Sequence, residues 1–362
     1  MSEMRKIVIV STVGLIYDGI TSIITSYLEA MDKTDLEIYV VSTIKAEPNI
    51  EEKIEKFGCK IVHLPSRKKN TVKYFISLQT FIHRNGIEVI HAHGNSATLA
   101  IEMLAGLLGG CKKRIAHSHN TKCEQVKADK LLRPLFDLIY TDALACGDAA
   151  GKWLFGERSF TILKNGRDVD KYIFSLKKRK EIRDQYSLKD AVAIGHVGGF
   201  FEQKNHAFLM EIFREILNIN PNSKLFLIGD GPLKNEIELS VKDIKEHIIF
   251  TGAIDNVNDY LQALDGMLLP SLFEGLPLVT IEWQINGLPS LLSDKITNEC
   301  KLTETVKFES LTQEPKVWAE EIISMINSNN RETNSLDSVK AIKEKGFDIR
   351  DNAKILRDIY LS

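Results

Sequence analysis

VAIGHVGGFFEQKNH, residues 192–206, joins a short apolar run to a glycine pair and then to a polar turn. An apolar, β-branched run bounded by glycines predicts a buried strand that opens into a loop. Similar runs follow in KLFLIG, HIIFTG, GMLLP and PSLLS, with helical stretches between them. Strands that alternate with helices predict βαβ units and a parallel sheet. The second half of the chain is therefore predicted to be a doubly wound α/β domain.

The first half of the chain shows the same alternation. Its apolar runs are IVIV, EIYVV, KIVHL, EVIHA, RIAHS, ALAC and FTIL, and the charged stretch SLKKRKEIRDQYSLKD separates the two series. We therefore predict an α/β chain with two doubly wound Rossmann-like domains, residues 1–170 and 191–345, joined by a linker, residues 171–190. Residues 346–362 are predicted to form an amphipathic helix whose apolar face consists of Ile349, Ala353, Ile355, Leu356 and Ile359.

Composition narrows the class of protein. The chain has 362 residues, of which 44% are hydrophobic and 27% are charged, as is typical of a globular chain of roughly two domains. A net charge of −2 argues against nucleic acid as a partner. The five cysteines are an odd number without a CxxC pair, so they indicate neither a disulfide framework nor a zinc site. A reducing cytoplasm fits this pattern.

The amino terminus, MSEMRKIVIVSTVGLIYDG, places basic residues before an apolar stretch, as a signal peptide does. It lacks a small-residue cleavage site, so a first buried strand at residues 7–10 is the better interpretation. The apolar stretch TLAIEMLAGLLGG is shorter than the roughly 20 residues needed to span a bilayer, and it contains Glu102. We expect no integral membrane segment.

Loops that follow strands are the candidate site. Two doubly wound domains that face each other leave a cleft lined by the carboxyl ends of their strands, where open α/β sheets bind ligands. After the strand at 192–197, Gly198 and Gly199 permit close approach of a phosphate, and Lys204 adds a positive charge and donors. A solvated lysine at a helix start is the alternative for Lys204.

Two further loops are less specific. LIGDGPLKNEIE, residues 227–238, carries Gly229 and Gly231 between a strand and a helix. It contains GxG but not GxGxxG, so it is a weak dinucleotide signature, and a tight β-to-α turn is the alternative. FTGAIDNV, residues 250–257, could offer backbone groups to a flat base.

SLFEGLPLVTIEW, residues 271–283, places Glu274 and Glu282 on either side of a Gly-Leu-Pro turn. A helix that begins near Pro277 leaves the N–H groups of residues 275–279 unpaired, and with the helix dipole these form a site for phosphate. The two carboxylates flank this site and would accept hydrogen bonds from hydroxyl groups, a sugar at one end and a ribose at the other. A surface loop with two solvated acids is the alternative.

Histidines occur in pairs at strand ends, in VIHAHGN (89–95) and RIAHSHNT (114–121). Residues at i and i+2 of a strand point to the same side, so each pair shares a face. Three alternatives stay open: structural histidines, a histidine that faces the cleft, and a metal site, for which no nearby carboxylate is found. Asp168-Val-Asp170 similarly mimics an Asp-x-Asp metal site, but its place after Asn165-Gly166 favours a capped turn.

Five motifs, HSHNT, ILKNGRD, VGGFFEQKNH, IGDGPL and PSLFEGLPLVTIEWQINGLP, follow one another along the chain. Together they resemble the group 1 family of retaining glycosyltransferases with the GT-B fold, in particular bacterial enzymes of capsule and exopolysaccharide assembly. The resemblance spans nearly the whole chain and implies a C-terminal helix that crosses back to the first domain. It also implies transfer of a sugar from a nucleotide-diphosphate sugar, expected to be UDP-linked, to a lipid-linked saccharide, with no metal and no cofactor.

The resemblance implies roles for individual residues. Glu274 would bind hydroxyls of the donor sugar, Glu282 would hold the ribose, and Lys204 would bind the diphosphate and stabilise the leaving group. His119 matches the family's histidine next to the donor sugar. The other implied donor-binding positions are Gly275, Leu276, Pro277, Leu278, Gly198, Gly199, Gly229, Gly231, the hinge residue Asn165, and Gly19, which ends a flexible acceptor-side loop that begins at Gly14.

Two positions depart from the family pattern. An arginine usually follows the first glycine of the loop, and Gly199 occupies that place, so one diphosphate contact is missing or supplied elsewhere. Arg167 stands where the hinge motif more often has an aliphatic residue, and the sequence does not show that it reaches the phosphate.

Two other functions remain as alternatives. One is a sugar-nucleotide epimerase of the same fold, whose pattern of catalytic acids is not found. The other is a degenerate binding subunit, against which four retained residues argue: Lys204, Glu274, Glu282 and His119.

An anionic membrane surface is predicted as a further partner. SRKKNTVKYFISLQTFIHR, residues 66–84, places basic residues beside aromatic ones, as in a helix that lies on anionic lipid. These residues are Arg67, Lys68, Lys69, Lys73, Tyr74, Phe75 and Phe81. A core-packed helix with a basic start is the alternative. We therefore expect a cytoplasmic protein that associates with the inner face of the cell membrane.

Overall fold

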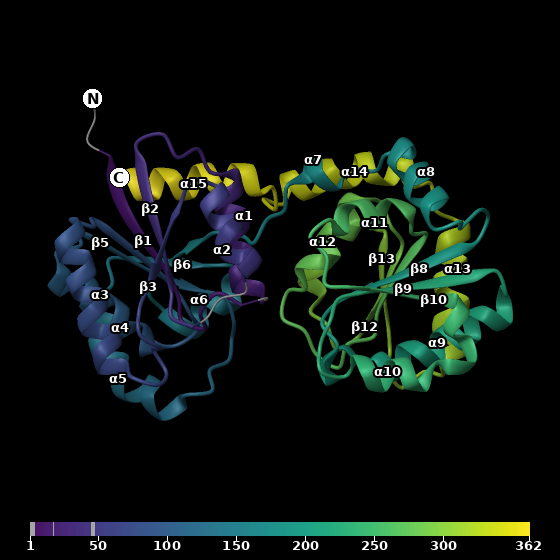
Figure 1. Ribbon diagram of the computed structural model, residues 1–362, viewed down its shortest axis with the longest axis horizontal. Coiled ribbons are helices and arrows are strands. Elements are labelled where there is room, and N and C mark those ends of the chain that lie inside the picture. The colour runs from purple at the N-terminus through teal and green to yellow at the C-terminus, as the bar shows by residue number, and fades with distance from the viewer. Residues whose placement is uncertain (1–3, 17, 45–47) are drawn as a thin grey trace. The chain divides into compact units, whose positions relative to one another are not determined.

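The computed structural model describes residues 4–16, 18–44 and 48–362. It divides into two compact units. Residues Met1–Gly166 and Gly346–Ser362 form the first unit, and Arg167–Lys345 form the second. Figure 1 shows that each unit contains one sheet with helices packed around it. Both units are therefore α/β, as predicted.

The sheet of the first unit has the strand order β3-β2-β1-β4-β5-β6-β7, and all of its described pairings are parallel. Its central strands are buried, as expected of a parallel sheet whose two faces are both covered. The strands are β1 (Arg5–Ser11), β2 (Leu36–Ser42), β3 (Lys60–His63), β4 (Val89–His93), β5 (Lys113–Ser118), β6 (Asp142–Ala145) and β7 (Thr161–Ile162).

The helices of the first unit lie next to these strands in the sequence, and three of them, α1, α3 and α15, begin at a residue whose side chain caps the helix. The side chains of Asp18, Asn70 and Asp348 accept hydrogen bonds from backbone N–H groups at the starts of α1, α3 and α15. The helices are α1 (Gly19–Ala30), α2 (Pro48–Lys56), α3 (Thr71–Asn85), the 3₁₀ helix η1 (Ala97–Leu99), α4 (Ala100–Gly109), α5 (Val126–Ile139), α6 (Asp148–Phe155) and α15 (Ile349–Leu361).

The last helix, α15, packs in the first unit against α1 and β1, which confirms the predicted return of the C-terminal helix. Tyr360 is fully buried, and its hydroxyl lies 2.6 Å from Nδ1 of His91. The predicted apolar face of this helix is wrong at one residue, because the side chain of Ile355 is 46% exposed. The buried side of α15 instead follows helical spacing through Ile349, Ala353, Leu356 and Tyr360.

The sheet of the second unit has the strand order β10-β9-β8-β11-β12-β13 and is also parallel in its described pairings. Its strands are β8 (Val192–Val197), β9 (Ser223–Ile228), β10 (Ile248–Gly252), β11 (Gly266–Leu269), β12 (Ser290–Ser293) and β13 (Val306–Glu309). Its helices are α7 (Val169–Tyr172), α8 (Leu176–Gln185), η2 (Glu202–Lys204), α9 (His206–Ile219), α10 (Lys234–Ser240), η3 (Lys242–His247), α11 (Val257–Ala263), α12 (Leu278–Ile285), η4 (Asn298–Cys300), α13 (Pro315–Asn327) and α14 (Arg331–Glu344).

Each of the twelve apolar runs named in the sequence contains a strand. The sequence pattern misses β13. Its four residues, VKFE, include two charged side chains, and the strand lies at the edge of the sheet, where it pairs with β12. A short edge strand with polar residues carries little of the apolar signal on which the prediction depends.

The boundary between the units differs from the predicted linker. The first unit ends at Gly166 rather than at residue 170, and residues 171–190 lie within the second unit, where they include α8. A side chain at Gly166 would come within 2.7 Å of the backbone N of Ile349, so this residue packs tightly against the start of α15. Only glycine permits such an approach of two backbone segments.

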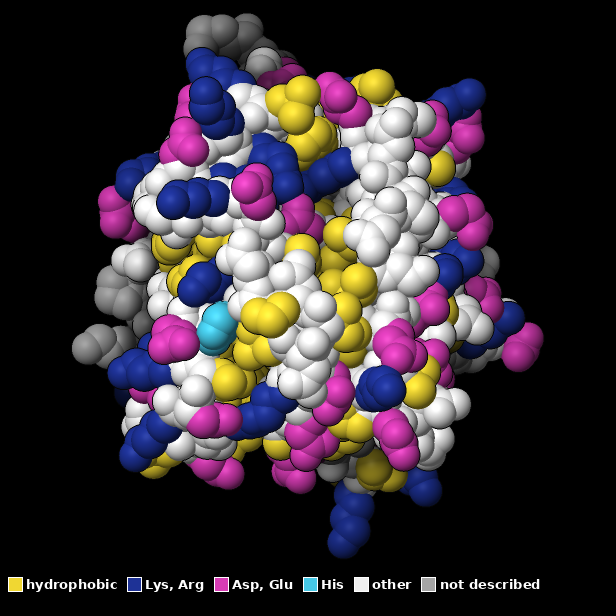
Figure 2. Space-filling view, turned by 90° about the vertical axis from the view of Figure 1, so that its right-hand side faces the viewer, with side chains coloured by type: hydrophobic (Ala, Val, Ile, Leu, Met, Phe, Trp, Pro, Cys, Tyr) yellow, Lys and Arg dark blue, Asp and Glu magenta, His cyan; other side chains and the backbone are white. Residues whose placement is uncertain are grey.

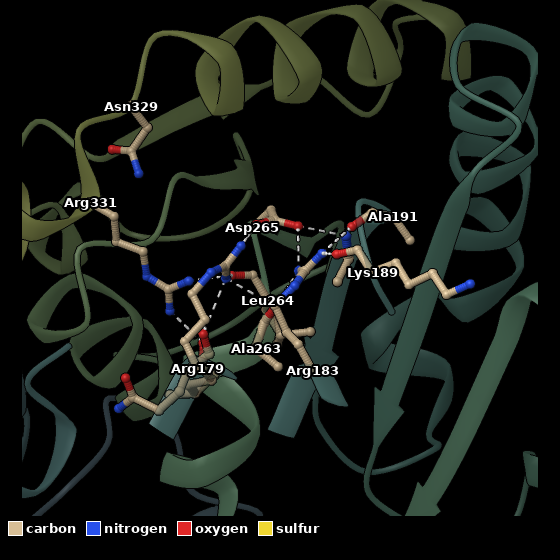
Figure 3. Close-up of polar contacts among 12 residues, drawn as sticks. Arg179, Arg183, Lys189, Ala191, Ala263, Leu264, Asp265, Asn329 and Arg331 are labelled. Atoms are coloured by element: carbon tan, nitrogen blue, oxygen red, sulfur yellow. Dashed lines mark hydrogen bonds and ion pairs between the residues drawn. The ribbon is translucent and has the colours of Figure 1, made fainter. Parts of the chain in front are cut away.

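Arginine contacts explain why the charged stretch is not a free linker (Figure 3). Arg179 and Arg183 of α8 both donate hydrogen bonds to the carbonyl of Ala263, at the C-terminal end of α11, and both pair with Asp265. Arg331 of α14 donates to the carbonyl of Leu261, which also lies in α11. Carbonyl groups at a helix C-terminus attract cations. These contacts hold α8 and α14 to the second unit.

The strand order of each sheet reverses at one strand. In the first unit β1 lies between β2 and β4, and in the second β8 lies between β9 and β11. Loops on either side of such a point diverge and leave room for a ligand at the carboxyl edge of the sheet. In the second unit these loops are residues 198–204, after β8, and residues 270–277, after β11. They contain Lys204 and Glu274.

The helix that the sequence predicts to bind lipid packs on the core of the first unit with one of its faces. Tyr74 of α3 is fully buried, and Phe75 and Phe81 pack against the hydrophobic core of the first unit. Arg67 is also buried, with its Nε 2.7 Å from Oε1 of Glu102. The apolar face of α3 therefore covers the sheet, and the buried Tyr74 and Arg67 are not available to lipid. Association of this segment with a membrane stays a prediction. Among the helices in the described ranges, we find none that combines the length and the apolar character needed to cross a membrane.

Candidate functional site

Lys204 and Glu274, which lie 70 positions apart in the sequence, meet in the second unit. Lys204 ends η2, and its Nζ lies 2.5 Å from Oε1 of Glu274. Their side chains are 16% and 9% exposed. The two strands that precede them, β8 and β11, are hydrogen-bonded neighbours, so their C-terminal loops share one edge of the sheet. The pair is therefore enclosed by the protein but still open to a ligand.

Two further side chains hold Glu274 in place. Ser271 donates a hydrogen bond to Oε1 at 2.9 Å, and Gln203 donates one to Oε2 at 3.1 Å. Helix α12 begins four residues after Glu274, at Leu278, with Pro277 in an extended conformation before it. The N–H groups of the first helical turn have no partner within the helix and can bind an anion there. A fixed carboxylate and a helix N-terminus thus lie along one short stretch of chain, and Lys204 of the neighbouring loop contacts the carboxylate.

Glycines at this edge bring two loops together. A side chain at Gly229, whose φ is +145°, would come within 2.1 Å of the carbonyl oxygen of Gly198. A side chain at Gly231 would come within 2.7 Å of the backbone N of Phe200. The loop after β9 therefore packs backbone to backbone on the loop after β8, and Gly229 and Gly231 have a packing role independent of any ligand.

Gly198 and Gly199 lie directly beside the candidate lysine. A side chain at Gly198 would press on Cε of Lys204 at 3.0 Å and on Nε2 of His196 at 3.2 Å. Gly199 has no positive φ, and a side chain there would meet the half-exposed ring of Phe201 at 2.6 Å. Gly198 thus leaves room for the stem of Lys204, whereas Gly199 is restricted only by a movable ring.

Glu282, the second carboxylate of the motif, pairs with Arg167. Nε of Arg167 lies 2.6 Å from Oε1 of Glu282, and the two side chains are 6% and 9% exposed. Glu282 lies in α12, and Arg167 directly precedes Asp168, the capping residue of the short helix α7, which packs against α12. In the second unit, the two glutamates of the motif therefore each meet one cation, Lys204 or Arg167.

Asp168 and Asp170 form the capped turn that the sequence favours. The side chain of Asp168 accepts a hydrogen bond from the backbone N–H of Asp170 at 3.1 Å and caps α7. This confirms the interpretation of Asp168-Val-Asp170 as a turn.

The first unit gathers four histidine rings at the carboxyl edge of its sheet. His93 pairs with His117 in the register of β4 and β5, and His91 and His119 lie two residues away on the same side. Nε2 of His119 lies 2.8 Å from Nδ1 of His93, and Nε2 of His91 lies 3.1 Å from Nδ1 of His117. The i, i+2 spacing thus produces the shared face that the sequence predicts.

Burial keeps these histidines uncharged. It lowers the pKa of His91, His93 and His117 well below 6.5, and it lowers the pKa of His119 to about 3. Nδ1 of His119 is buried without a hydrogen-bond partner among the described residues, while its backbone N–H donates to Oδ1 of Asn95 at 3.0 Å. A neutral imidazole can donate or accept one hydrogen bond at that nitrogen.

The histidine cluster could also hold a metal ion. His91, His93 and His117 each offer one nitrogen, and these atoms lie within 4.8 Å of one another. Two of the four rings, however, already use nitrogens in the His91–His117 hydrogen bond, and His93 uses one with His119. Structural and metal-binding roles for these three residues therefore both remain open to test.

Two predicted binding residues lie in the first unit. Asn165 is buried, and its Oδ1 has no hydrogen-bond partner within the described ranges. Gly19 is the first residue of α1, and a Cβ atom at this position would meet no other atom within 4 Å. Residue 17 of the predicted loop from Gly14 to Gly19 lies outside the described residues. Asn165 and Gly19 stay predictions as ligand contacts.

Sequence reasoning missed the side chains that support the predicted ones. Ser271 and Gln203 bind Glu274, His93 binds His119, and Arg167 binds Glu282. Ser271 stands three positions before Glu274 and Gln203 stands next to Lys204, so their nearness in sequence was the available signal. Arg167 and Glu282 are 115 positions apart, and no local pattern connects them.

This arrangement suits a ligand with both anionic and hydroxyl groups. A lysine and a helix N-terminus bind phosphate, and carboxylates accept hydrogen bonds from hydroxyls. In the second unit, Lys204 and the start of α12 supply the former, and Glu274 and Glu282 supply the latter.

Comparison with known proteins agrees with this chemistry. Residues 191–328 match the family model described as "Glycosyl transferases group 1". The chain is 29% identical over 377 residues to the proposed glycosyltransferase EpsF of Bacillus subtilis (strain 168), which covers 99% of this chain and 97% of that protein. It is 26% identical over 314 residues to the UDP-Gal:alpha-D-GlcNAc-diphosphoundecaprenol alpha-1,3-galactosyltransferase of Escherichia coli, which covers 80% of this chain and 79% of that protein.

A solved structure shares the fold of the whole chain. The crystal structure of Anabaena Alr3699/HepE in complex with UDP and glucose has a TM-score of 0.78 to this structure, at 15% identity. The match covers 98% of this chain and 99% of that chain. The α/β architecture of both units is therefore that of a known fold.

Proposed function

Because this chain belongs to the group 1 glycosyltransferases, which have the GT-B fold, we propose that it is a retaining enzyme that moves a sugar from a UDP-sugar to a lipid-linked saccharide in bacterial surface polysaccharide synthesis. The Escherichia coli relative supports the donor and the acceptor class, because its name specifies UDP-Gal and a diphosphoundecaprenol-linked GlcNAc. No metal and no cofactor is included in this proposal.

The contact between Lys204 and Glu274 carries the proposal. It joins a cation and a carboxylate at two neighbouring strand ends, beside the N-terminus of α12. In the proposed complex, Lys204 and the N–H groups of residues 275–279 bind the diphosphate, and Glu274 orients the sugar. The positive charge of Lys204 then stabilises the negative charge that develops on the leaving diphosphate.

The remaining candidate residues complete the donor site in this proposal. Glu282 binds the ribose, and neutral His119 hydrogen-bonds to the transferred sugar through an imidazole that carries no charge at neutral pH. Asn165 and Gly19 are proposed contacts of the donor in the first unit. Transfer on the face from which the diphosphate leaves would retain the configuration of the sugar.

Nucleotide binding and turnover test the proposal separately. In a thermal-shift screen of UDP, GDP and ADP, we expect UDP to raise the melting temperature most, because a ligand that binds only the folded state stabilises it. Release of UDP from a UDP-sugar should then require a lipid-linked saccharide acceptor. Turnover without any acceptor would instead indicate an epimerase, and binding without turnover under any condition would indicate a binding subunit.

The proposal includes a cytoplasmic location with attachment to an anionic membrane, where a lipid-linked acceptor resides. The attachment surface is on helices α3, α4 and α5, which pack in that order in the first unit (Figure 1). On α3, Val72 and Ile76 are 70% and 55% exposed, next to the exposed Lys69 and Lys73. The segment 66–86 contains no acidic residue. Such a mixture of apolar and basic side chains favours anionic lipid.

Helix α5 continues this surface with a regular stripe. Leu131 and Leu138 are 79% and 81% exposed, and they recur with Lys127 and Pro134 at i, i+4, i+7 and i+11 along one side of the helix. The two acids of α5 are occupied, Asp129 by Arg133 and Asp137 by Arg158. By contrast, Figure 2 shows basic and acidic side chains interspersed on the face of the molecule that it displays.

Co-sedimentation with liposomes tests the attachment. The wild-type protein should bind anionic liposomes at low salt more strongly than neutral ones, and the double variant Leu131→Gln/Leu138→Gln should lose roughly tenfold or more of this binding, because each leucine gives up about 1.5–3 kcal/mol of apolar burial. Leu239→Gln, at a 62% exposed leucine of α10, is the matched control. Equal binding to both lipids, or wild-type binding by the double variant, removes this part of the proposal.

A further inference from the structure

We infer that Arg167 is a positioning residue for nucleotide recognition: it holds one carboxylate oxygen of Glu282 so that the other one faces the ribose hydroxyls of the donor. This inference rests on the proposed function, in which Glu282 binds the ribose. The observation behind it is the contact of 2.6 Å between Nε of Arg167 and Oε1 of Glu282.

The contact occupies only one oxygen of Glu282. Among the described residues, Oε2 of Glu282 receives no hydrogen bond, and the side chain keeps 9% of its surface exposed. Its neighbours Ile281 and Trp283 in α12 are fully buried. Since a carboxylate can accept hydrogen bonds at both oxygens, the open oxygen of Glu282 can still accept one from a ligand hydroxyl.

Within the described ranges, a second buried Arg–Glu pair differs, because both oxygens of its carboxylate are occupied. Arg67 binds both oxygens of Glu102, with Nε 2.7 Å from Oε1 and Nη2 3.1 Å from Oε2, and it also donates to the carbonyl of Thr98. Glu102 is fully buried. That carboxylate has no oxygen left for a ligand, whereas the one of Glu282 does.

The guanidinium of Arg167 also fixes the direction of the open oxygen. A carboxylate can rotate about its last bond, and its terminal torsion is broad. A charge-assisted hydrogen bond to one oxygen fixes this torsion and preserves the negative charge. The proximity of α7 to α12 keeps Arg167 in place, because the side-chain amide of Asn286, directly after α12, donates to the carbonyl of Tyr172 at 2.6 Å.

Preference for the ribose hydroxyls measures this role directly. Isothermal titration gives the affinities for UDP, 2′-deoxy-UDP and 3′-deoxy-UDP. A hydrogen bond from a hydroxyl to a charged acceptor corresponds to roughly ten- to hundredfold in affinity. The wild-type protein should therefore prefer UDP to at least one deoxy analogue by about this factor. In Arg167→Met the preference should fall to about threefold or less.

A double-mutant cycle separates positioning from general damage. Glu282→Gln should reduce the preference by itself, and Arg167→Met should reduce it no further in the Glu282→Gln background, because the two residues act as a unit. The double variant also removes both buried charges, so it remains a folded test case if Arg167→Met alone is unstable. Arg67→Met is the matched control: it breaks the other pair, and it should lower the melting temperature while leaving the preference unchanged.

These experiments tell a failure of the inference about Arg167 apart from a failure of the proposed function. If the wild-type protein does not bind UDP, the proposed donor is wrong and the inference is withdrawn with it. If UDP binds but Arg167→Met weakens UDP and both deoxy analogues equally, Arg167 contacts the diphosphate or only supports the fold, and the inference is overturned. Loss of the preference in Arg167→Met and Glu282→Gln, without a further loss in the double variant, supports it.

Discussion

The two units place different chemistry at equivalent positions of similar sheets. Both are parallel, and both carry their candidate residues at the carboxyl edge next to the strand where the order reverses. The second unit has charged pairs there, Lys204 with Glu274 and Arg167 with Glu282. The first unit has a group of buried histidines whose pKa values burial lowers. One architecture thus supports a charged and an uncharged site.

The difference shows which partner each edge can recognise. Fixed charges select a ligand that bears phosphate and hydroxyl groups, because the cations and the carboxylates each need an opposite or donating group. Neutral imidazoles in a buried setting offer hydrogen bonds without attracting ions. The strand ends of the second unit therefore suit a nucleotide-diphosphate sugar, and those of the first suit uncharged sugar hydroxyls.

The largest expected effect comes from removing a charge in the second unit. Glu274→Gln should lower kcat roughly a hundredfold, because a hydrogen bond from a sugar hydroxyl to a charged acceptor is lost in the transition state. UDP should still bind, since its diphosphate contacts Lys204 and the start of α12 in our proposal. Initial rates and UDP titration measure the two properties. The exposed Glu238→Gln serves as the control with wild-type rates, and a fully active Glu274→Gln would refute the assigned role.

Adding a charge to the same edge should have the opposite effect. Gly199→Arg would supply the guanidinium that the family usually has and should raise kcat/KM for the donor by roughly ten- to hundredfold, as expected of charge-assisted contacts to the diphosphate. The backbone permits the change, since the φ of Gly199 is not positive, but the ring of Phe201 must move. Steady-state kinetics and melting temperatures test this together.

Gly199→Ala separates the two consequences of that substitution, because it moves the ring of Phe201 without adding charge. If Gly199→Arg is as stable as Gly199→Ala but no more active than the wild type, then another group already fills the role of the arginine, or the diphosphate does not lie against this loop.

The neutral histidines of the first unit should make the free energy of unfolding depend on pH. Burial lowers the pKa of His119 to about 3. Below pH 6.5 the ring of His119 therefore binds a proton in the unfolded state, whereas in the folded state it stays neutral down to about pH 3. The free energy of unfolding should therefore fall as pH drops from 6.5, by about 1.4 kcal/mol per pH unit for each such histidine. Denaturant titrations between pH 5 and 7 should show a smaller slope for His119→Asn. An unchanged slope in His119→Asn would contradict a neutral ring at this position.

The smallest expected effect is that of metal removal. If the histidine cluster is a neutral hydrogen-bonded group, EDTA should leave the rate of sugar transfer unchanged. A rate that EDTA abolishes and manganese restores would contradict the metal-free proposal. His91→Asn would then distinguish a metal at the cluster, where the nitrogens of His91, His93 and His117 lie within 4.8 Å, from a metal elsewhere.

Local patterns accounted for most of the architecture. Twelve short apolar runs became strands, because the signal for a buried parallel strand is contained in four to eight consecutive residues. The same holds for the turn at Asp168, which depends on a side chain and the backbone two residues later. Lys204, Glu274 and Glu282 were named from motifs that each occupy a single loop or helix start, although their ligand contacts stay predictions.

These local patterns could not predict whether the amphipathic segment 66–84 packs on a core or lies on a membrane. The basic and aromatic residues of 66–84 fit a helix on lipid as well as a helix on a core. Only the packed structure shows that Tyr74 covers the sheet and that Arg67 meets Glu102, 35 positions away. The prediction of a linker at 171–190 was wrong for the same reason. Arg179 and Arg183 donate hydrogen bonds to a carbonyl that lies about 80 positions further along the chain.

By itself, then, the sequence determined the α/β class, the strand positions and the loops that carry the candidate residues, because these depend on spacing over a few residues. Only the tertiary structure decided which cation meets which carboxylate: Lys204 with Glu274, and Arg167 with Glu282. Such pairs form between residues that chain folding brings together, and their energy depends on burial and distance rather than on sequence separation. The open oxygen of Glu282 is a property of that packing, and no local pattern encodes it.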